Sequence, residues 1–424
     1  MTGLRLTGSR GISPNLALDE LVRERRRNGE SVVHLGFGES RLPVFPPLVE
    51  RLTAGSGRNG YGPVRGDLAA RTAVAGYFTR RRMATEPDQV VLAPGSKPLL
   101  AALQMCVHGD TLLPRPCWNT YPPQALLAGK SVLQVPIPAG CGGVPEPTAL
   151  ARTIRSARAD GRDPRILVLA LPDNPTGTLA PPELVRELCE LARQEDLLIV
   201  SDEIYRDLLH DPARLVLSPA EVAPERTVVT TGLSKNLALG GWRIGAARFP
   251  SDAWGARLRD TVASFASEVW STLAGPMQEV AAYAFAEPPE LRAYLDRAAR
   301  LHGALAREVH RVVTDAGAEC RPPTAGFYVY PDFGPRRETL SRQGVTDSAS
   351  LQQRLLDAHG IAVLGGHHHG DDPGALRFRA ATSMLYGDTA EEQLAALHSA
   401  DPLALPHTAQ LLTALRKGFT ELCD

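Results

Sequence analysis

The chain has 424 residues and a formal net charge of -1 at pH 7. This near balance of charge argues against a nucleic acid or an anionic membrane as the main partner. No apolar run reaches the length of a membrane span, and the first residues lack the apolar core of a signal peptide. The cysteines form no CxxC pair, which argues against a disulfide framework or a zinc site; they are Cys106, Cys117, Cys141, Cys189, Cys320 and Cys423. We therefore expect a cytoplasmic α/β protein that is long enough for two domains.

Apolar runs alternate with amphipathic stretches along most of the chain. The apolar runs predict strands at 32–35, 90–93, 111–114, 132–137, 166–171, 197–200, 227–230, 326–330, 361–364 and 376–379. Amphipathic periodicity and helix-start residues predict helices at 13–27, 67–82, from 98 onward, at 182–194 and at 289–316. This alternation predicts a mostly parallel sheet, whose functional site lies at the carboxyl ends of the strands.

Glycines and polar side chains follow the first three of these strands. Gly38 is part of either a plain turn or a close approach of the backbone to a ligand. Gly95, Ser96 and Lys97 precede a helix whose free N–H groups and dipole could bind an anion, although an ordinary capped helix gives the same pattern. Trp118 lies in a proline-rich loop, where its ring either fills the core or stacks on a flat partner.

Polar residues also follow the strands at 166–171 and 197–200. Asn174 belongs to an Asn-Pro-Thr-Gly turn, and Asp202 is followed three residues later by Tyr205. An acid at the end of a strand can cap a helix or hold a positively charged ligand group. Because the carboxyl ends of parallel strands share one edge, we expect these side chains to form a single site.

Lys235 follows the strand at 227–230, and Arg243 follows a turn that contains Gly240 and Gly241. A lysine at the end of a buried strand is costly unless it is paired or neutral, and condensation with an aldehyde makes it neutral. Pyridoxal phosphate (PLP) binds proteins in this way, with an acid next to its pyridinium nitrogen. Asp202 would be that acid, and Arg243 could hold the phosphate. Taken alone, the Ser-Lys pair also fits a solvent-exposed lysine.

Ser234-Lys235 together with Gly241-Trp242-Arg243-Ile244-Gly245 resembles the PLP-lysine signature of the class I/II aminotransferases, which have fold type I and are related to aspartate aminotransferase. The resemblance extends from about residue 13 to the low 390s. It implies a large PLP-binding domain at 50–295, with a mostly parallel sheet. It also implies a smaller α/β domain formed by both termini, at 1–49 and 296–424.

The resemblance implies a role for each matched residue around the cofactor. Lys235 would form a Schiff base with PLP and then move the proton of the substrate Cα, as base and then as acid. Asp202 would keep the ring nitrogen protonated, and Trp118 would stack on the ring. Asn174 and Tyr205 would contact the 3-hydroxyl oxygen. The phosphate would be bound by Gly95, Ser96, Lys97 and Arg243, and by Tyr61 of the neighbouring subunit of a homodimer with shared sites.

Gly38, Asn174 and Arg377 would bind the substrate carboxylate, as the resemblance implies. Because Arg379 would face the same side of its strand as Arg377, the choice of Arg377 depends on the match rather than on the pattern. Glu268 and Trp270 would line the mouth of the neighbouring subunit's site; a helix cap beside a core tryptophan is the alternative.

Three features depart from the resemblance or lie outside it. Gly232 stands where the family has a phosphate-binding serine, so we expect Thr231, Ser96 and backbone N–H groups to contribute instead. The loop 367–369 contains three adjacent histidines, which splay apart and lack a further ligand, so we predict no metal. The amphipathic tail at 408–422 would pack on the small domain or on a partner.

The predicted reaction is the PLP-dependent transfer of an amino group between an amino acid and a 2-oxo acid. The same scaffold supports a cyclase, an elimination or replacement enzyme, or an oxidase of specialised metabolism, and all of these begin at the same carbanion. A PLP-binding regulator of transcription would carry an added DNA-binding module, and no such module or basic arm precedes residue 13. The amino donor and acceptor are not encoded in any recognised motif.

Overall fold

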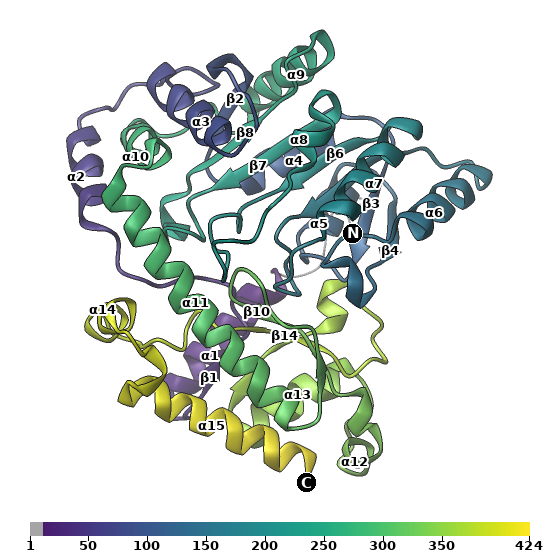
Figure 1. The fold of residues 1–424 in the computed structure, drawn as a ribbon, viewed down its shortest axis with the longest axis vertical. Helices are drawn as coiled ribbons and strands as arrows, with labels where there is room; N and C mark the ends of the chain where they lie inside the picture. The colour runs from purple at the N-terminus through teal and green to yellow at the C-terminus, as the bar shows by residue number, and fades with distance from the viewer. Residues whose placement is uncertain (1–11) are drawn as a thin grey trace, which may run out of the picture.

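The computed structural model of the protein describes residues 12–424, and a seven-stranded sheet forms its centre (Figure 1). The strands follow the order β2-β8-β7-β6-β5-β3-β4. All are parallel except β8, which runs antiparallel to β2 and β7. Their bounds are Val90–Ala93 (β2), Asp110–Arg115 (β3), Val132–Pro136 (β4), Pro164–Ala170 (β5), Leu198–Asp202 (β6), Thr227–Gly232 (β7) and Gly245–Arg248 (β8).

The alternation of side chains along each strand builds one apolar layer on each face of this sheet. On β5, Leu167 and Leu169 pack with residues of α6 (Pro147–Ala159) and α7 (Pro182–Gln194). Ile166 and Val168 of the same strand pack on the opposite face with residues of α4 (Ser96–Cys106) and α9 (Ala253–Val269). Helices therefore cover both faces, and the polar side chains gather at the edge where the parallel strands end.

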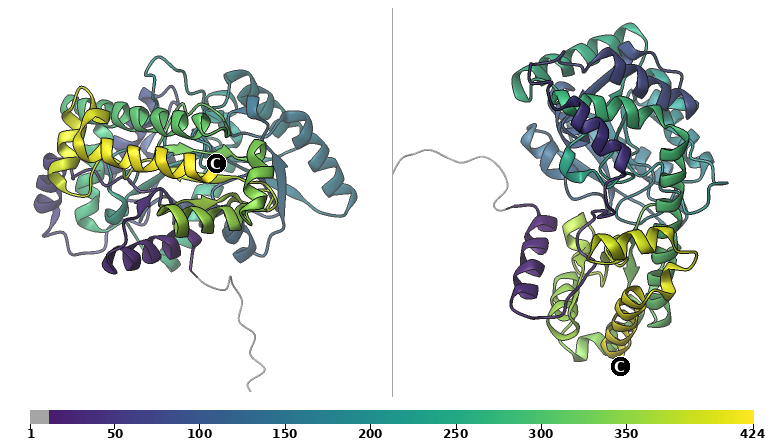
Figure 2. Two further views of the ribbon diagram at one scale, coloured as in Figure 1. Left: turned by 90° about the horizontal axis from the view of Figure 1, so that it is seen from below. Right: turned by 90° about the vertical axis from the view of Figure 1, so that its left-hand side faces the viewer.

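The two ends of the chain meet in a second group of elements, which we call the terminal lobe. Its strands form three short sheets, in which β1 (Val33–His34) pairs with β12 (Ile361–Ala362), β10 (Tyr328–Val329) and β13 (Leu364–Gly365) flank β14 (Phe378–Ala381), and β9 (Glu319–Cys320) pairs with β11 (Pro331–Asp332). Its helices are α1 (Pro14–Arg27), α12 (Arg337–Arg342), α13 (Ser348–His359), α14 (Ala390–His398) and α15 (Pro406–Cys423). Figures 1 and 2 show this lobe below the large sheet, with α1 packed along one side.

The remaining helices complete the core between the two groups. The long helix α11 (Pro289–Asp315) runs from the large sheet into the terminal lobe (Figure 1). The helix α10 (Gly275–Ala286) packs against both α2 (Pro46–Gly55) and α3 (Leu68–Arg80). The shorter helices α5 (Tyr121–Leu127) and α8 (Pro219–Val222) follow β3 and precede β7. No helix within residues 12–424 is long and apolar enough to cross a membrane.

Neighbouring side chains of β14 face opposite sides of the strand, one side packing in the core and the other facing the cavity. Phe378 and Ala380 face the apolar core, where Phe378 stacks on Phe333 and Phe419 with ring centroids 5.8 and 6.0 Å apart. Arg379, between them, points to the opposite face, where the cavity described below opens. The stack of phenylalanines therefore determines which way the guanidinium points.

The predicted α/β fold with a mostly parallel sheet is confirmed, and most predicted elements lie within a few residues of the observed ones. The antiparallel strand β8 was not predicted, because Gly245–Arg248 is short and follows the lysine motif directly. The proposed domain boundary at residue 295 falls inside α11, and the division into domains stays a prediction.

Truncation of Phe419 tests the packing that orients β14. The Phe419 ring belongs to α15 and is fully buried against the rings of Phe333 and Phe378. Phe419→Ala should lower the free energy of unfolding by about 3–5 kcal/mol, because it leaves a cavity, and Phe419→Leu by only about 1–2 kcal/mol. Guanidinium unfolding followed by circular dichroism measures both values, and equal losses in the two variants would contradict this account of the packing.

Candidate active site

A cavity of about 490 Å³ opens at the carboxyl edge of the large sheet, between the sheet and the terminal lobe. Residues from at least ten separate segments line it, and several of them were predicted from the sequence as site residues. They are Ser13, Asn15, Leu16, Phe37, Gly38, Glu39, Ser96, Lys97, Trp118, Tyr121, Ala170, Asn174, Asp202, Ile204, Tyr205, Ser234, Lys235, Gly240, Arg243, Tyr328 and Arg379.

Lys235 enters this cavity from the segment after β7. Its Nζ donates a hydrogen bond to the carbonyl oxygen of Gly38 at 2.6 Å. Burial, and after it the nearby cation of Arg379, lowers the pKa of Lys235 to about 8. A large fraction of this amine is therefore neutral near pH 8 and can act as a nucleophile or a base.

Asp202 ends β6 and faces the same cavity. Its carboxylate accepts hydrogen bonds from Tyr121 Oη at 2.9 Å and from Thr230 Oγ1 at 3.3 Å, but it makes no salt bridge within residues 12–424. Burial raises the pKa of Asp202 to about 6, against the opposing effect of these hydrogen bonds. A buried carboxylate with neutral neighbours suits a cationic N–H group of a ligand.

The anion-binding corner lies at the start of α4. Gly95 adopts a φ of +90°, and a Cβ at this position would lie 2.2 Å from Nη2 of Arg243. The glycine therefore allows the guanidinium to lie directly beside the N-terminus of an 11-residue helix. Lys97, in the first turn of that helix, places its Nζ 5.2 Å from the ring centroid of Trp118. Burial and the neighbouring Arg243 lower the pKa of Lys97, as expected where cations gather without an anion.

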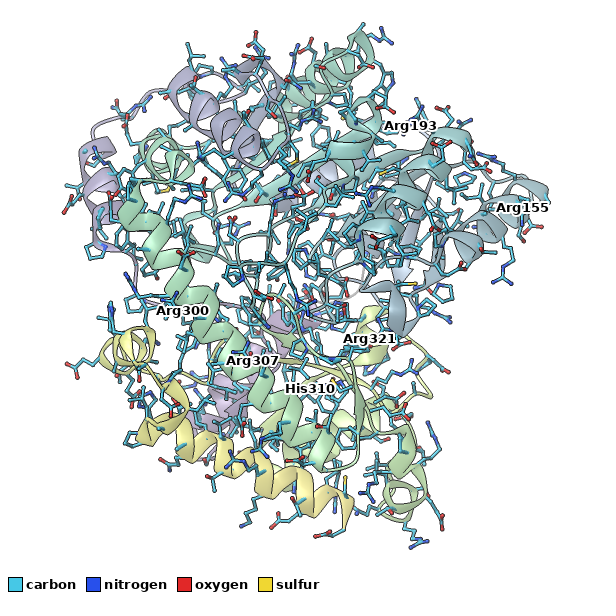
Figure 3. The ribbon with its side chains drawn as sticks, viewed as in Figure 1. Arg155, Arg193, Arg300, Arg307, His310 and Arg321 are labelled. Atoms are coloured by element: carbon cyan, nitrogen blue, oxygen red, sulfur yellow. The ribbon has the colours of Figure 1, made fainter. Side chains whose placement is uncertain are left out.

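Arg379 lines the cavity, whereas Arg377, the residue predicted to bind the substrate carboxylate, does not. The Arg377 guanidinium makes salt bridges to Asp332 at 2.8 Å and to Asp371 at 3.3 Å. These contacts lie in a second cleft, which also contains Arg321 (Figure 3). Arg377 precedes β14, and its backbone pairs with that of Asp332 in an isolated antiparallel β-bridge. The carboxylates of Asp332 and Asp371 hold the Arg377 side chain away from the cavity.

The Arg379 side chain has only neutral partners. It is 1% exposed and donates hydrogen bonds to Asn174 Oδ1 at 3.2 Å, to Asn15 Oδ1 at 3.0 Å and to the Gly36 carbonyl oxygen at 2.9 Å. Within residues 12–424 no carboxylate lies within salt-bridge distance. A buried cation without a counter-charge is costly, and an anionic ligand group would offset that cost.

Aromatic rings form the walls around these charges. The hydroxyl groups of Tyr205 and Tyr328 are 2.7 Å apart. Trp118 packs edge-to-face on Tyr121, with ring centroids 5.3 Å apart. A Cβ at Gly38 would lie 2.1 Å from the Tyr328 hydroxyl oxygen, so a side chain there would displace this ring.

The geometry accounts for the glycine at position 232. Gly232 pairs with Gly245 across β7 and β8, and a Cβ at Gly232 would lie 2.8 Å from the Ile244 carbonyl oxygen. A serine there would require a shift of β8. The Ser234 side chain lines the cavity instead, two residues further along.

Some predicted residues lie away from this cavity. Tyr61 is 91% exposed, and neither Glu268 nor Trp270 lines the cavity, so their roles at a neighbouring subunit stay predictions. His369 is buried and directs Nδ1 to the Cys117 carbonyl oxygen at 3.0 Å. No cluster of three or more His, Cys, Asp or Glu side chains within residues 12–424 is arranged to hold a metal ion.

Sequence reasoning missed several side chains in the cavity. Tyr121 and Thr230 donate hydrogen bonds to Asp202. Asn15 accepts a hydrogen bond from Arg379, and the Tyr328 ring lies beneath the Arg379 guanidinium. Tyr121 and Thr230 lie in segments already singled out, next to Trp118 and in the strand before Lys235. Asn15 had been assigned only to the start of a helix, and no signal in the sequence placed that helix over the cavity.

The comparisons with known proteins agree on one family. The family model "Aminotransferase class I and II" matches residues 30–386. The probable aspartate/prephenate aminotransferase of Thermus aquaticus is 31% identical over 372 residues, which cover 84% of this chain and 88% of that protein. The chain belongs to the class I and II aminotransferase family.

Further relatives extend this result to the fold. The aspartate/prephenate aminotransferase of Thermus thermophilus is 30% identical over 364 residues, which cover 84% of this chain and 88% of that protein. The structure of aspartate aminotransferase from Thermus thermophilus with maleate has a TM-score of 0.80 and 26% sequence identity, and it covers 96% of this chain and 97% of that chain. The protein is therefore a PLP-dependent aminotransferase with the fold type I architecture.

The residues in the cavity fit PLP. Within residues 12–424 the buried Asp202 carboxylate makes no salt bridge, and the corner at Gly95 and Arg243 gathers positive charge around a helix N-terminus. Burial lowers the pKa of Lys235 to about 8, so the amine is readily neutral. These are the groups required by a pyridinium nitrogen, a phosphate and an aldehyde.

Asp202→Asn tests whether the ionised Asp202 carboxylate destabilises the folded protein when no cationic ligand is bound. Because the pKa of Asp202 is raised on folding, the folded state holds its proton more tightly than the unfolded state, and stability falls as pH rises from about 4 through 6. The cofactor-free variant should be more stable than the cofactor-free wild type above pH 7, by on the order of 2 kcal/mol, and equally stable below pH 4. Unfolding curves at both pH values measure the difference.

The same substitution should weaken PLP binding, because the neutral amide cannot balance a pyridinium charge. The Thr230→Val variant serves as the control, because it keeps the carboxylate and removes one hydrogen bond that lowers the pKa of Asp202. It should keep the fall in stability with rising pH and extend it to higher pH. A stability difference between Asp202→Asn and wild type that does not change with pH would contradict the account.

Proposed function

We propose that the protein transfers an amino group between an amino acid and a 2-oxo acid, with Lys235 as the residue that binds PLP covalently. The observation that supports this best is the presence of Lys235, Asp202 and Arg379 in one cavity without ion partners. PLP supplies an aldehyde for the amino group and a ring that accepts the electron pair released at the substrate Cα.

The residues around the ring would hold and activate it. Asp202 would accept a hydrogen bond from the ring N–H and favour the protonated nitrogen, and Tyr121 and Thr230 keep the carboxylate oriented. Trp118 provides an aromatic surface on one side of the cavity, while Tyr205 and Asn174 provide hydrogen-bonding groups for the 3-hydroxyl oxygen. Ser96, Ser234 and Arg243, which line the cavity near the start of α4, would bind the phosphate.

The substrate carboxylate would bind to Arg379 and Asn174. A guanidinium binds a carboxylate through two parallel hydrogen bonds, which fixes the orientation of the Cα–H bond. Lys235 Nζ then takes the Cα proton, and its pKa of about 8 makes the amine available as a base near neutral pH.

The curated relatives are named for aspartate and prephenate, so aspartate and glutamate are the first amino donors to test. The comparisons do not favour the alternative reactions of the same scaffold. We further propose a cytoplasmic homodimer in which Tyr61 reaches the neighbouring site; its 91% exposure leaves the ring available for such a contact. The domain division near residues 49 and 295 belongs to the same proposal.

A half-reaction screen tests the proposed function. The protein loaded with PLP should absorb visible light and lose that absorbance on addition of its amino donor, with release of one 2-oxo acid per site. Addition of a 2-oxo acid should restore the absorbance. Lys235→Ala should bind PLP without turning over. Release of a cyclised, deaminated or hydroxylated product, with no recovery of the absorbance by any 2-oxo acid, would overturn transamination.

The pair Arg379→Ala and Arg377→Ala tests the corrected position of the carboxylate site. Arg379 has no counter-charge, whereas Arg377 is already paired with Asp332 and Asp371. We expect Arg379→Ala to lower kcat/KM by at least roughly 100-fold, mainly through KM, and Arg377→Ala to change it by less than about threefold. Steady-state kinetics with the donor found in the screen give both ratios, and the reverse order would restore the original choice of Arg377.

A further inference from the structure

A chain of hydrogen bonds connects Arg379 to residues 116–120, which we call the Trp118 loop. Arg379 Nη2 donates to Asn15 Oδ1 at 3.0 Å, and Asn15 Nδ2 donates to Asn119 Oδ1 at 3.0 Å. The Asn15 side-chain amide therefore accepts a hydrogen bond from the guanidinium through its oxygen and donates one through its nitrogen to the residue directly after Trp118. Asn119 is buried and Asn15 is half-buried, so the hydrogen bond between them is partly withdrawn from water.

The Trp118 loop contacts the terminal lobe at a second place, on the other side of the tryptophan. The Cys117 backbone N–H donates to the His369 carbonyl oxygen at 3.0 Å, and His369 Nδ1 donates to the Cys117 carbonyl oxygen at 3.0 Å. Burial lowers the pKa of His369 well below its usual value, so the ring stays neutral with its proton on Nδ1. The residues before and after Trp118 are thus both bound to the terminal lobe, although Trp118 itself follows a strand of the large sheet.

The helix that carries Asn15 is anchored independently of this contact. In α1, Asp19 accepts hydrogen bonds from His34 at 3.2 Å and from Arg41 at 3.3 Å, and Leu18 and Val22 pack on the short sheets of the terminal lobe. Within residues 12–424 the hydrogen bonds of the Asn15 side chain go to Arg379 and Asn119, and none goes to the backbone of α1. Its side chain is therefore held for its contacts with Arg379 and Asn119 rather than for the stability of the helix.

We propose that Asn15 and Asn119 are positioning residues that couple carboxylate binding at Arg379 to the placement of Trp118. This inference rests on the proposed function, in which Arg379 binds the substrate carboxylate and Trp118 lies against the cofactor ring. A carboxylate that binds Arg379 fixes the guanidinium, the guanidinium fixes Asn15, and Asn15 holds the Trp118 loop. Substrate binding at one end of the cavity then orders the aromatic wall at the other end.

The test uses the full-length protein loaded with PLP and two unreactive carboxylates, propionate and maleate. Maleate is chosen because the structurally similar Thermus thermophilus aspartate aminotransferase is described with it. Dissociation constants are measured from the visible absorbance of the cofactor for wild type, Asn15→Ala, Asn119→Ala and the double variant. The near-ultraviolet circular dichroism change on carboxylate binding reports the tryptophan and the cofactor in each protein.

Each single variant should weaken carboxylate binding by roughly fivefold to tenfold, the effect of one hydrogen bond in a chain that ends on a charge. Because both residues act in one chain, the double variant should bind about as weakly as either single variant, and all three should lose most of the dichroism change. Thr120→Ala is the matched control, since the Thr120 side chain makes no hydrogen bond within residues 12–424; it should bind like wild type.

Wild-type affinity in Asn119→Ala, or losses that add in the double variant, would overturn the coupling. Normal affinity with a lost dichroism change would also overturn it, because binding would then not depend on the loop. Failure of the proposed function looks different: the wild type would not take up PLP, or Arg379→Ala would bind both carboxylates as tightly as wild type.

Discussion

The site depends on ionisable groups that are withdrawn from water without ion partners. Within residues 12–424, Arg379 hydrogen-bonds only to amide and carbonyl oxygens. Asp202 accepts hydrogen bonds from two hydroxyl groups and from the Ile204 backbone, and Lys235 donates a hydrogen bond to a backbone carbonyl oxygen. Burial without an opposite charge is unfavourable for each of them, and proteins ordinarily avoid it by pairing. One ligand system offsets all three costs together, since a substrate carboxylate, a pyridinium nitrogen and an aldehyde have complementary chemistry. The same burial lowers the pKa of the lysine that must act as nucleophile and base.

The fold places these groups by two simple rules. The carboxyl ends of the parallel strands β5, β6 and β7 bring Asn174, Asp202 and Lys235 to one edge. The terminal lobe adds Arg379 from the opposite side, because the alternation along β14 sends Phe378 into the core and Arg379 into the cavity. The cavity thus lies between the large sheet and the terminal lobe. The contacts of Asn15 and His369 with residues 116–120 join the two sides next to the aromatic wall.

Much of this could be predicted from the sequence, because local signals carry it. Apolar runs located the strands, and the residues that follow them predicted the lysine, the acid and the anion-binding corner. The sequence did not show whether Arg377 or Arg379 faces the cavity, because residues two apart share a face in an ideal strand. In the structure the carboxylates of Asp332 and Asp371 hold the Arg377 side chain away from the cavity. Asn15 could not be predicted, because its role depends on how a helix from one end of the chain packs across the cavity.

Chemical trapping at the lysine tests the central claim most directly. The chain contains four lysines, and two of them, Lys97 and Lys235, line the cavity. The protein is incubated with PLP, reduced with borohydride and digested, and the modified peptide is identified by mass spectrometry. The account predicts a phosphopyridoxyl group on Lys235 alone, with no labelling in Lys235→Ala. Labelling of Lys97 in the wild type, or no stable labelling at all, would contradict it.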